Sequence, residues 1–566
     1  MHKTQQNLLK YLDTVKQIVQ KVQMTGPDLR IDLKPVADLE TLIRSKELLI
    51  PVVGAFSAGK SSLLNTLMGA QTLPIAITPE TAIPTELRHD KRERLEALFT
   101  DGRVQEFGIQ EFHALQKRAA ELECVRIYIN NPPLQKLAPL VLVDMPGFNS
   151  PLDAHNKAIA RYIGEGAHYL FVVSVEEGTL HSATLSRIEE IANMGRSFSI
   201  CVNKADLRPP ADVEEIRTCI AERLEEENLV ANVCAVSQDD TSSVQTLLSG
   251  INPDNLFNNL FQPALRQQHR ALDGILQTAF DGLQRDKAAN DKTMHEMEEA
   301  LRALEQERHQ KAQRSTNLES ATDDLLHTVS NRLNRCVDSM AQAMLHGGQD
   351  EMVRIVSDEV RSSLVEGARR ATDSMSAQLV ADFSLRASSN LRPEIHLSKD
   401  WTDGLLQKLQ SELLPALLST LGGSNSDKTQ TSNTGTASLG VAAMYLGKFV
   451  QHPVLKIVLN LLPSLLGGLF GQIGEGQKLE TLKTAIRNQV LPDIVRRLRP
   501  EVSTFLLHAQ QQALQAVAES FEGQIKVQKD MLDKVSQDIS ASNKEALIAT
   551  VKDALDELNA LQKTYL

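Results

Sequence analysis

The stretch LLIPVVGAFSAGKSS, residues 48–62, joins an apolar run to a glycine-bracketed loop and to the start of a helical pattern. Gly54 is followed by four residues and then by Gly59, Lys60 and Ser61, which is the spacing G-x-x-x-x-G-K-[ST]. Backbone N–H groups of such a loop point inward and bind phosphate oxygens, and the helix that follows adds the positive end of its dipole. The stretch therefore predicts a phosphate-binding loop between a strand and a helix.

Each residue type in this loop has a chemical reason. Glycine is needed at positions 54 and 59 because a Cβ there would block the path of the chain or the phosphate. We expect Lys60 to reach the β- and γ-phosphates and the Ser61 hydroxyl to hold Mg²⁺. The residues expected around the phosphates are Gly54, Ala55, Phe56, Ser57, Ala58, Gly59, Lys60, Ser61 and Ser62.

Length and composition predict several structural units. The chain has 566 residues, which exceeds what a single apolar core holds. Glu, Gln, Leu, Ala, Lys and Arg dominate its second half, as is typical of a mainly helical protein with one α/β part. The formal net charge of −12 argues against non-specific nucleic-acid binding, so no nucleic-acid partner is expected.

Cysteine usage and the N-terminal sequence both bear on the compartment. The five cysteines are scattered and form no C-x-x-C, which argues against a disulfide scaffold and a zinc site and favours a reducing compartment. The start, MHKTQQNLLKYLD, contains no apolar run of the signal-peptide type. We therefore expect a cytoplasmic protein without a signal peptide.

Strand and helix patterns alternate from residue 48 to residue 255. This alternation predicts a nucleotide-binding domain with a mainly parallel sheet that is covered on both faces. The expected strands are Leu48–Val53, Leu95–Thr100, Val125–Asn130, Leu140–Asp144, Tyr169–Val175, Ser197–Asn203 and Val233–Ser237.

Helical patterns occupy most of the remaining chain, so the fold class is α/β plus all-α with an elongated helical bundle. Residues 1–47 are expected to add helices to a neck bundle, although a membrane-surface helix is an alternative for the first of them. Residues 256–421 form the neck and trunk, with a narrow apolar seam of the coiled-coil type. Residues 422–476 contain a polar loop and then an apolar tip, and residues 477–566 return to the trunk and neck.

Two further motifs follow the phosphate loop in the order of a guanine-nucleotide site. Asp144 and Gly147 belong to D-x-x-G, in which the aspartate holds Mg²⁺ through water and the glycine N–H meets the γ-phosphate. Asn203, Lys204 and Asp206 belong to N-K-x-D. The Asp206 carboxylate can accept from both N1–H and the amine of guanine, a pattern that adenine lacks. The stem of Lys204 would lie on the base, and Asn203 would brace the loop.

Ser237 and a switch threonine complete the expected site. Ser237 ends Ala-Val-Ser after the last strand, where a backbone N–H meets guanine O6. In the segment 73–87 we choose Thr81 to complete the Mg²⁺ shell, with Thr78 as the alternative; these threonines could instead only cap a proline-rich loop. The motifs follow the carboxyl ends of apolar strands, where α/β sheets bind ligands, so GTP or GDP with Mg²⁺ is the expected ligand.

The apolar tip lies in residues 441–476. Its segment Pro453–Gly471 carries one charged residue, Lys456, and Pro463 interrupts its helical pattern. A short helical hairpin that enters one membrane leaflet fits this pattern better than a transmembrane span, for which the length would suffice. Helices buried against the trunk or a partner subunit are the other alternative. Membrane lipid is thus an expected partner.

The motifs resemble those of one family. The phosphate loop GAFSAGKSSLLNTLMG, residues 54–69, the P-x-T-A at residues 79–82 and the D-M-P-G at residues 144–147 are similar to the dynamin family, especially its bacterial dynamin-like branch. The resemblance covers the nucleotide domain residue by residue and the rest in architecture only. It implies a large GTPase that is activated when two nucleotide domains meet face to face, a neck and trunk that move with the nucleotide, and a tip that touches lipid.

One position departs from the family pattern. In dynamins proper this loop carries a glutamine that polarises the attacking water and then a serine that helps to position a cation. Here the two positions hold Phe56 and Ser57, and a phenyl ring cannot orient water. The resemblance thus implies slow hydrolysis, with Lys60, Ser57, Thr81 and Gly147 as catalytic residues and with Ser61, Thr81 and Asp144 at the metal.

The sequence therefore predicts a dynamin-like GTPase that is peripherally associated with a membrane, forms homodimers through its nucleotide domains and works with partner dynamin-like subunits. Two alternatives stay open. The first is a GTP-binding assembly scaffold with little hydrolysis, which Phe56 favours. The second is a coiled-coil ATPase of the SMC type, which N-K-x-D opposes.

Overall fold

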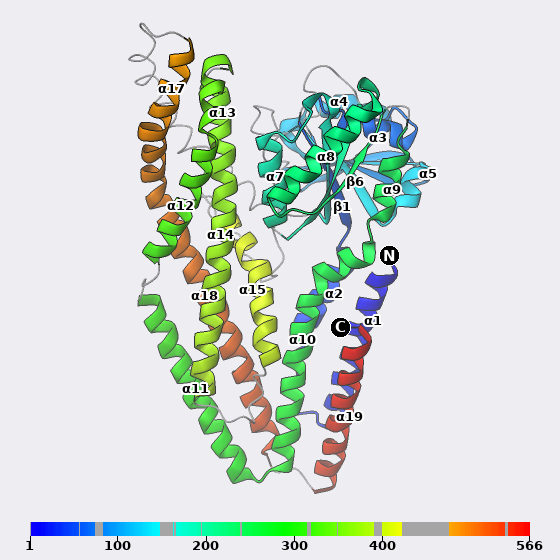
Figure 1. Ribbon diagram of the computed structural model, residues 1–566. Helices are drawn as coiled ribbons and strands as arrows, with labels where there is room; N and C mark the ends of the chain where they lie inside the picture. Colours follow the sequence, from blue (N-terminus) through cyan, green and yellow to red (C-terminus); the bar gives the residue numbers. More distant parts are fainter. Residues whose placement is uncertain are drawn as a thin grey trace.

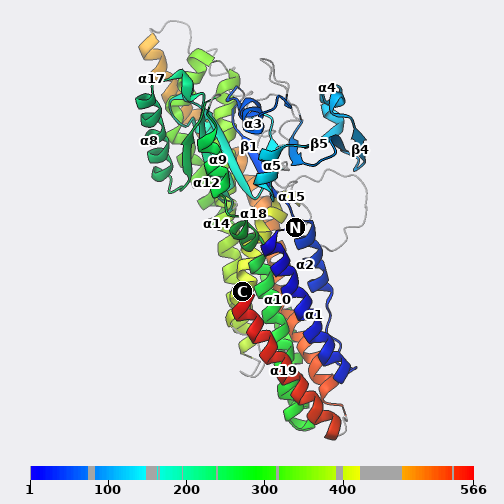
Figure 2. The ribbon, with the colours of Figure 1, turned by 90° about the vertical axis from the view of Figure 1, so that its right-hand side faces the viewer.

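The computed structural model describes residues 2–55, 57–73, 83–147, 162, 166–193, 195–237, 240–313, 318–347, 349–389, 399–420, 475–537 and 541–565. An α/β nucleotide domain lies toward one end of an elongated assembly of long helices (Figures 1 and 2). One group of helices, the neck, continues from this domain, and a second group, the trunk, runs alongside both (Figure 1).

The nucleotide domain is built on one mixed sheet. Its strands are β1 (Leu48–Val53), β2 (Thr85–His89), β3 (Arg94–Phe99), β4 (Val104–Phe107), β5 (Leu122–Ile129), β6 (Leu140–Asp144), β7 (His168–Ser174), β8 (Ser197–Asn203) and β9 (Asn232–Ala235). Their order is β4-β3-β5-β2-β6-β1-β7-β8-β9. The neighbouring strands β6, β1, β7, β8 and β9 are parallel to one another. In the other half of the sheet, β2 is antiparallel to β6, and β3 is antiparallel to both β4 and β5.

The structure has a strand at each of the seven positions that the sequence predicts, and it adds β2 and β4. The sequences of these two strands, TELRH and VQEF, lack the apolar run that identified the others. Strand β2 nevertheless lies inside the sheet because Glu86 and Arg88 form ion pairs there. The α/β domain with a large helical part is therefore confirmed, with antiparallel pairs in one half of the sheet.

Both faces of the sheet are covered, as the apolar run of β1 indicates. Leu48, Ile50 and Val52 belong to one apolar core, and Leu49 and Val53 belong to another on the opposite face. The helices of this domain are α3 (Lys60–Met68), α4 (Phe112–Gln116), α5 (Pro132–Leu137), α7 (Ser182–Asn193), α8 (Pro210–Glu226) and α9 (Ser242–Gly250), with short 3₁₀ turns between some of them.

The neck consists of α1 (Lys3–Thr25), α2 (Lys34–Ser45), α10 (Pro253–Gln284) and α19 (Ala541–Tyr565). Helix α1 buries its apolar stripe against α10 and α19. The two chain ends lie at the ends of α1 and α19 that are nearer to the nucleotide domain (Figure 1). Inside this bundle the Tyr11 hydroxyl is 3.0 Å from His269 Nδ1. Neck residues such as Leu12 and Phe257 share one continuous core with Ile50 of the sheet.

The trunk has its own apolar core. Its helices are α11 (Lys287–Gln313), α12 (Leu318–Arg335), α13 (Val337–Gln342), α14 (Gln349–Ser388), α15 (Lys399–Thr420), α17 (Glu475–Ala485) and α18 (Leu491–Val535), with π-helical turns at Ala343–Gly347 and Ile486–Val490. Trp401 packs edge-on against Phe521 at a ring distance of 5.0 Å in this core. No helix in the described ranges is both long and apolar enough to span a bilayer. The predicted tip lies outside those ranges, except for its last two residues.

Candidate functional site

The phosphate loop leaves β1 beside β7, and this neighbour explains the first glycine. A Cβ added to Gly54 would lie 3.2 Å from the carbonyl carbon of Val172 and closer still to its oxygen. Ser57 and Gly59 both have left-handed backbone conformations, with φ of 66° and 85°. Helix α3 then begins at Lys60. The loop is thus a tight turn from strand to helix, as its motif predicts.

Lys60 is buried inside this loop. Its side chain donates to the carbonyl oxygens of Gly54 at 3.1 Å and of Ala55 at 2.9 Å. Burial lowers the pKa of Lys60 to about 8, and the nearby charge of Asp144 opposes this shift. The ammonium therefore lies where the loop turns around it, next to the carboxylate of the D-x-x-G motif.

Ser61 and Asp144 make the expected metal-binding pair. The Ser61 hydroxyl donates to Asp144 Oδ2 at 2.7 Å. Asp144 is 1% exposed, and burial raises the pKa of its carboxyl to about 6 against the effects of Ser61 and Lys60. Its other oxygen, Oδ1, is buried and has no hydrogen-bond partner among the described residues. A buried, unsatisfied carboxylate oxygen beside a hydroxyl is a donor set that suits Mg²⁺.

A cavity of about 110 Å³ lies between the phosphate loop and the predicted guanine loop. Its lining residues are Gly59, Ser62, Leu63, Thr66, Asn203, Lys204, Asp206, Leu207 and Ser237. Asn203 joins the two loops, since its Nδ2 donates to the carbonyl oxygens of Ala58 at 3.0 Å and Gly59 at 3.3 Å. Lys204 has a left-handed backbone, and its ammonium contacts Glu176 at 2.6 Å.

Backbone hydrogen bonds fix the guanine loops to each other. Ala205 N–H donates to the carbonyl of Val236 at 2.9 Å, and Val236 N–H donates to Val202 at 2.8 Å. Ser237 N–H donates to the carbonyl of Asp240 at 3.2 Å. The Asp206 side chain is exposed beside this pair of loops.

The structure thus brings Lys60, Ser61 and Asp144 together and places the residues of N-K-x-D and Ser237 around one adjoining cavity. Gly147 lies at the end of the described part of the loop that follows β6. Phe56, Thr78 and Thr81 lie outside the described residues.

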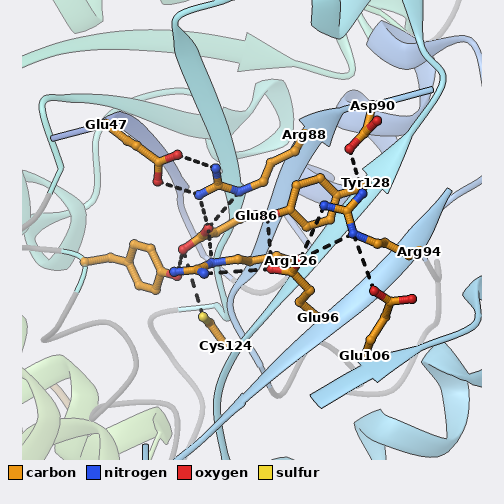
Figure 3. A network of polar contacts seen from close by, with 11 residues as sticks. Glu47, Glu86, Arg88, Asp90, Arg94, Glu96, Glu106, Cys124, Arg126 and Tyr128 are labelled. Atoms are coloured by element: carbon orange, nitrogen blue, oxygen red, sulfur yellow. Dashed lines mark hydrogen bonds and ion pairs between the residues drawn. The ribbon is translucent and has the colours of Figure 1, made fainter. Parts of the chain in front are cut away.

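The motifs did not reveal a charged network on β2 (Figure 3). Its central carboxylate, Glu86, is 3% exposed. Tyr162 Oη donates to Glu86 Oε1 at 2.7 Å, and Arg88 and Arg126 bind Glu86 Oε2 at 2.5 and 3.2 Å. Arg88 also binds Glu47, with its Nη2 at 2.7 Å from Oε2. Burial, with Cys124 and Glu86 nearby, holds the pKa of the Tyr162 hydroxyl well above its usual range, so this group stays a donor.

No motif pointed to this network, because its members are far apart in the chain. Glu86 and Tyr162 are 76 residues apart, and Glu47 and Arg88 are 41 apart. A glutamate between two positions that bury threonine and leucine, in a strand without an apolar run, was the available hint.

A phosphate loop at the end of β1, a buried serine–aspartate pair and an adjoining cavity lined by N-K-x-D define a P-loop nucleotide-binding domain of the G-domain class. Residues 50–206 match the model of the dynamin family. The nucleotide domain of this chain is therefore similar to dynamin-family domains, as the resemblance predicted, and that similarity implies GTP or GDP as its ligand.

Relatives in bacteria agree with this assignment. Dynamin-like protein 2 of Campylobacter jejuni is 34% identical over 115 residues, which cover 20% of this chain and 19% of that protein. The bacterial dynamin-like protein of Nostoc punctiforme is 26% identical over 231 residues, which cover 36% of this chain and 33% of that protein. The chain spans about half the length, or less, of the curated relatives that it matches.

A solved structure also covers most of this chain. It belongs to an oligomerised bacterial dynamin pair that is described as providing a mechanism for long-range sensing and tethering of membranes. It covers 94% of this chain and 91% of its own, with 14% sequence identity and a TM-score of 0.31.

Proposed function

We propose that this chain is a GTPase that binds GTP with Mg²⁺ and hydrolyses it slowly. Its nucleotide domains would pair in response to the nucleotide, and this pairing would be coupled to movement of its helices and to membrane binding or remodelling, such as vesicle release, fusion or fission. The observation that carries the proposal is the Ser61–Asp144 pair, with its unpartnered carboxylate oxygen beside Lys60.

The proposed roles follow from chemistry and position. Lys60 would exchange the carbonyl oxygens that it now binds for phosphate oxygens of higher charge, which make stronger hydrogen bonds. Ser61, Thr81 and Asp144 would hold Mg²⁺, which would neutralise charge on the β- and γ-phosphates. Ser57 would help to position a charge-compensating cation, and the Gly147 N–H would meet the γ-phosphate.

The guanine end would depend on the loops around the adjoining cavity. The Asp206 carboxylate would accept hydrogen bonds from the N1–H and the amine of guanine, and the stem of Lys204 would lie on the ring of the base. Asn203 already joins the guanine loop to the phosphate loop, so the two ends of the nucleotide would meet one rigid unit.

The Glu86 network offers a route from the nucleotide to the neck. Strand β2 follows the segment that contains Thr81, and Tyr162 follows the D-x-x-G loop. Both meet at Glu86, which Arg88 joins to Glu47 between α2 and β1. A movement of either switch segment would therefore act on the residue at which the neck enters the domain.

The proposed partners are membrane lipid, a second copy of this chain and other dynamin-like subunits. The apolar composition of residues 441–476 supports lipid contact. Self-association follows from the similarity of the nucleotide domain to the dynamin family, and the location that we propose is peripheral, on the cytoplasmic side of a membrane.

The second candidate is a GTP-binding scaffold with little hydrolysis, which Phe56 favours. Steady-state turnover separates the two functions. GTP hydrolysis that rises steeply with protein concentration or with liposomes supports the GTPase. Tight GTP binding without turnover in all of these conditions supports the scaffold.

Two substitutions test the site itself. Lys60→Ala should abolish binding of a fluorescent GTP analogue, and Asp206→Asn should shift the preference from GTP toward xanthosine triphosphate. Lys529→Gln, in a trunk ion pair far along the chain, is the matched control and should leave both affinities unchanged. Retention of wild-type GTP affinity and base preference by the Asp206 variant would contradict the guanine assignment.

A further inference from the structure

Helix α7 of the nucleotide domain lies against α12 and α14 of the trunk (Figure 1). Three of its charged residues are almost completely buried: Arg187 is 8% exposed, Glu189 is 6% and Glu190 is 2%. Such residues are rarely buried without partners. The helix therefore contacts the trunk through a buried surface of charged residues.

The centre of this surface is an arginine of the trunk. Arg332 on α12 donates to Glu189 and also donates to Ser362 Oγ at 2.8 Å. Ser362 on α14 in turn donates to Glu189 at 3.1 Å. Arg332 lies 3.8 Å from Glu359 and 3.6 Å from Glu366, so one guanidinium serves carboxylates from both parts of the molecule.

Contacts on both sides of this centre extend the surface along α7. Arg187 donates to Glu190 at 3.0 Å and lies 3.5 Å from Asp358 of α14. At the carboxyl end of α7, Arg369 of α14 donates to the carbonyl oxygens of Ala192, at 3.3 Å, and Asn193. A cation at this end suits the negative end of the helix dipole.

The apolar residues of α7 face away from the trunk. Leu185, Ile188 and Ile191 belong to the core on one face of the sheet, and no described α7 residue belongs to the trunk core. A polar cavity of about 340 Å³ borders the contact, and its lining includes Glu189, Glu227, Arg332, Arg335, Glu366 and Arg370. The contact can therefore open without exposing an apolar core, and water has access to it.

We propose that α7 and the trunk form a releasable ionic latch that holds the nucleotide domain against α12 and α14, so that movement of the domain requires its rupture. The event that would open the latch is GTP binding, so this part of the inference rests on the proposed function. Helix α7 follows a 3₁₀ turn whose Glu176 binds Lys204 of the guanine loop at 2.6 Å. A base stacked on Lys204 would compete for this contact and disturb the turn that leads into α7.

Electron-spin distance measurements on the full-length chain test the latch. One spin label would be placed on α8 at the exposed Thr218 and one on α11 at the exposed Arg302. The background would have serine in place of the cysteines that are not fully buried, which are Cys219, Cys234 and Cys336. The latch variants are Arg332→Gln and the milder Arg369→Gln, and Lys529→Gln breaks an ion pair inside the trunk as the control.

The latch predicts one narrow distance for the nucleotide-free wild type and for Lys529→Gln. Removal of one partner from a buried ion pair should raise the undocked fraction about 100-fold in Arg332→Gln, which would appear as a second, longer distance. If Arg332→Gln fails to fold by circular dichroism, Arg369→Gln decides. A wild-type distance distribution in a folded latch variant would overturn the proposal.

The same experiment tests separately whether nucleotide binding opens the latch. Addition of a non-hydrolysable GTP analogue with Mg²⁺ should lengthen the distance in the wild type, and no change would overturn the link to the nucleotide. Because the latch variants are compared without nucleotide, a failure of GTP binding in a parallel titration counts against the proposed function and leaves the latch result intact.

Discussion

Replacement of Gly54 by alanine tests whether the approach of β7 dictates the shape of the phosphate loop. Strands β1 and β7 pair up to Val53 and Phe171, so the next residue of each strand lies at the same level. A Cβ on residue 54 would meet the carbonyl group of Val172 at 3.2 Å from its carbon and closer to its oxygen. The loop must then move away from β7, or the two strands must separate.

The cost of that movement can be estimated. Overpacking of this kind costs about 1–3 kcal/mol, which lowers the melting temperature of a domain of this size by about 2–12 °C. A displaced loop also misaligns at least one N–H that would meet phosphate. A charge-assisted hydrogen bond is worth about 1.5–3 kcal/mol, so GTP binding should weaken by about 10- to 150-fold.

Titration with a fluorescent GTP analogue and a thermal melt measure the two effects of Gly54→Ala. Gly250→Ala is the matched control, because a Cβ at Gly250 would meet nothing within 4 Å and α9 would gain a better helix former. If Gly54→Ala binds the analogue and melts as the control does, the argument from strand β7 is wrong.

Three further predictions concern single contacts. Asn203→Ala removes the donor that joins the guanine and phosphate loops, so the affinity for the GTP analogue should fall about 10-fold in a titration, with wild-type circular dichroism. Tyr162→Phe leaves Glu86 Oε1 without its hydroxyl donor and should lower the free energy of unfolding by about 1–3 kcal/mol in urea, whereas Tyr128→Phe at the half-buried Glu96 should cost less. Burial, with Asp358 nearby and Arg187 opposing, raises the pKa of Glu190 from 4.5 to about 7. The docked state should therefore bind an extra proton between these pH values, so spin-label distances should show weaker docking at pH 8 than at pH 6, and Glu190→Gln should reduce this dependence.

Motif spacing was sufficient to predict the phosphate loop, because each of its constraints acts within a few residues. The same holds for the apolar strands β1, β6, β7 and β8, whose burial requires a continuous apolar run. The order of the motifs along the chain also predicted which strand ends would meet.

The charged networks could not be predicted in this way. Glu189 and Arg332 are 143 residues apart, and each would be expected on a solvated helix face from the sequence alone. Strand β2 was missed for the same reason, because Glu86 is acceptable inside a sheet only once Arg88, Arg126 and Tyr162 surround it. Partners that arrive from distant segments leave no periodic signal.

The chemistry of the two contact regions around the nucleotide domain indicates which one would open. On the neck side, Phe257 and Leu12 share one apolar core with Ile50 of the sheet, and separation there would expose that core to water at about 25 cal/mol for each Å². On the trunk side, α7 presents Arg187, Glu189 and Glu190, which water can solvate after separation. The domain should therefore stay joined to the neck and part from the trunk. Because α10 of the neck also packs against α15 and α18 of the trunk, a nucleotide-driven movement would turn the domain about the neck. The distance between a label on α8 and a label on α11 should then lengthen more than the distance between a label on α8 and a label on α1.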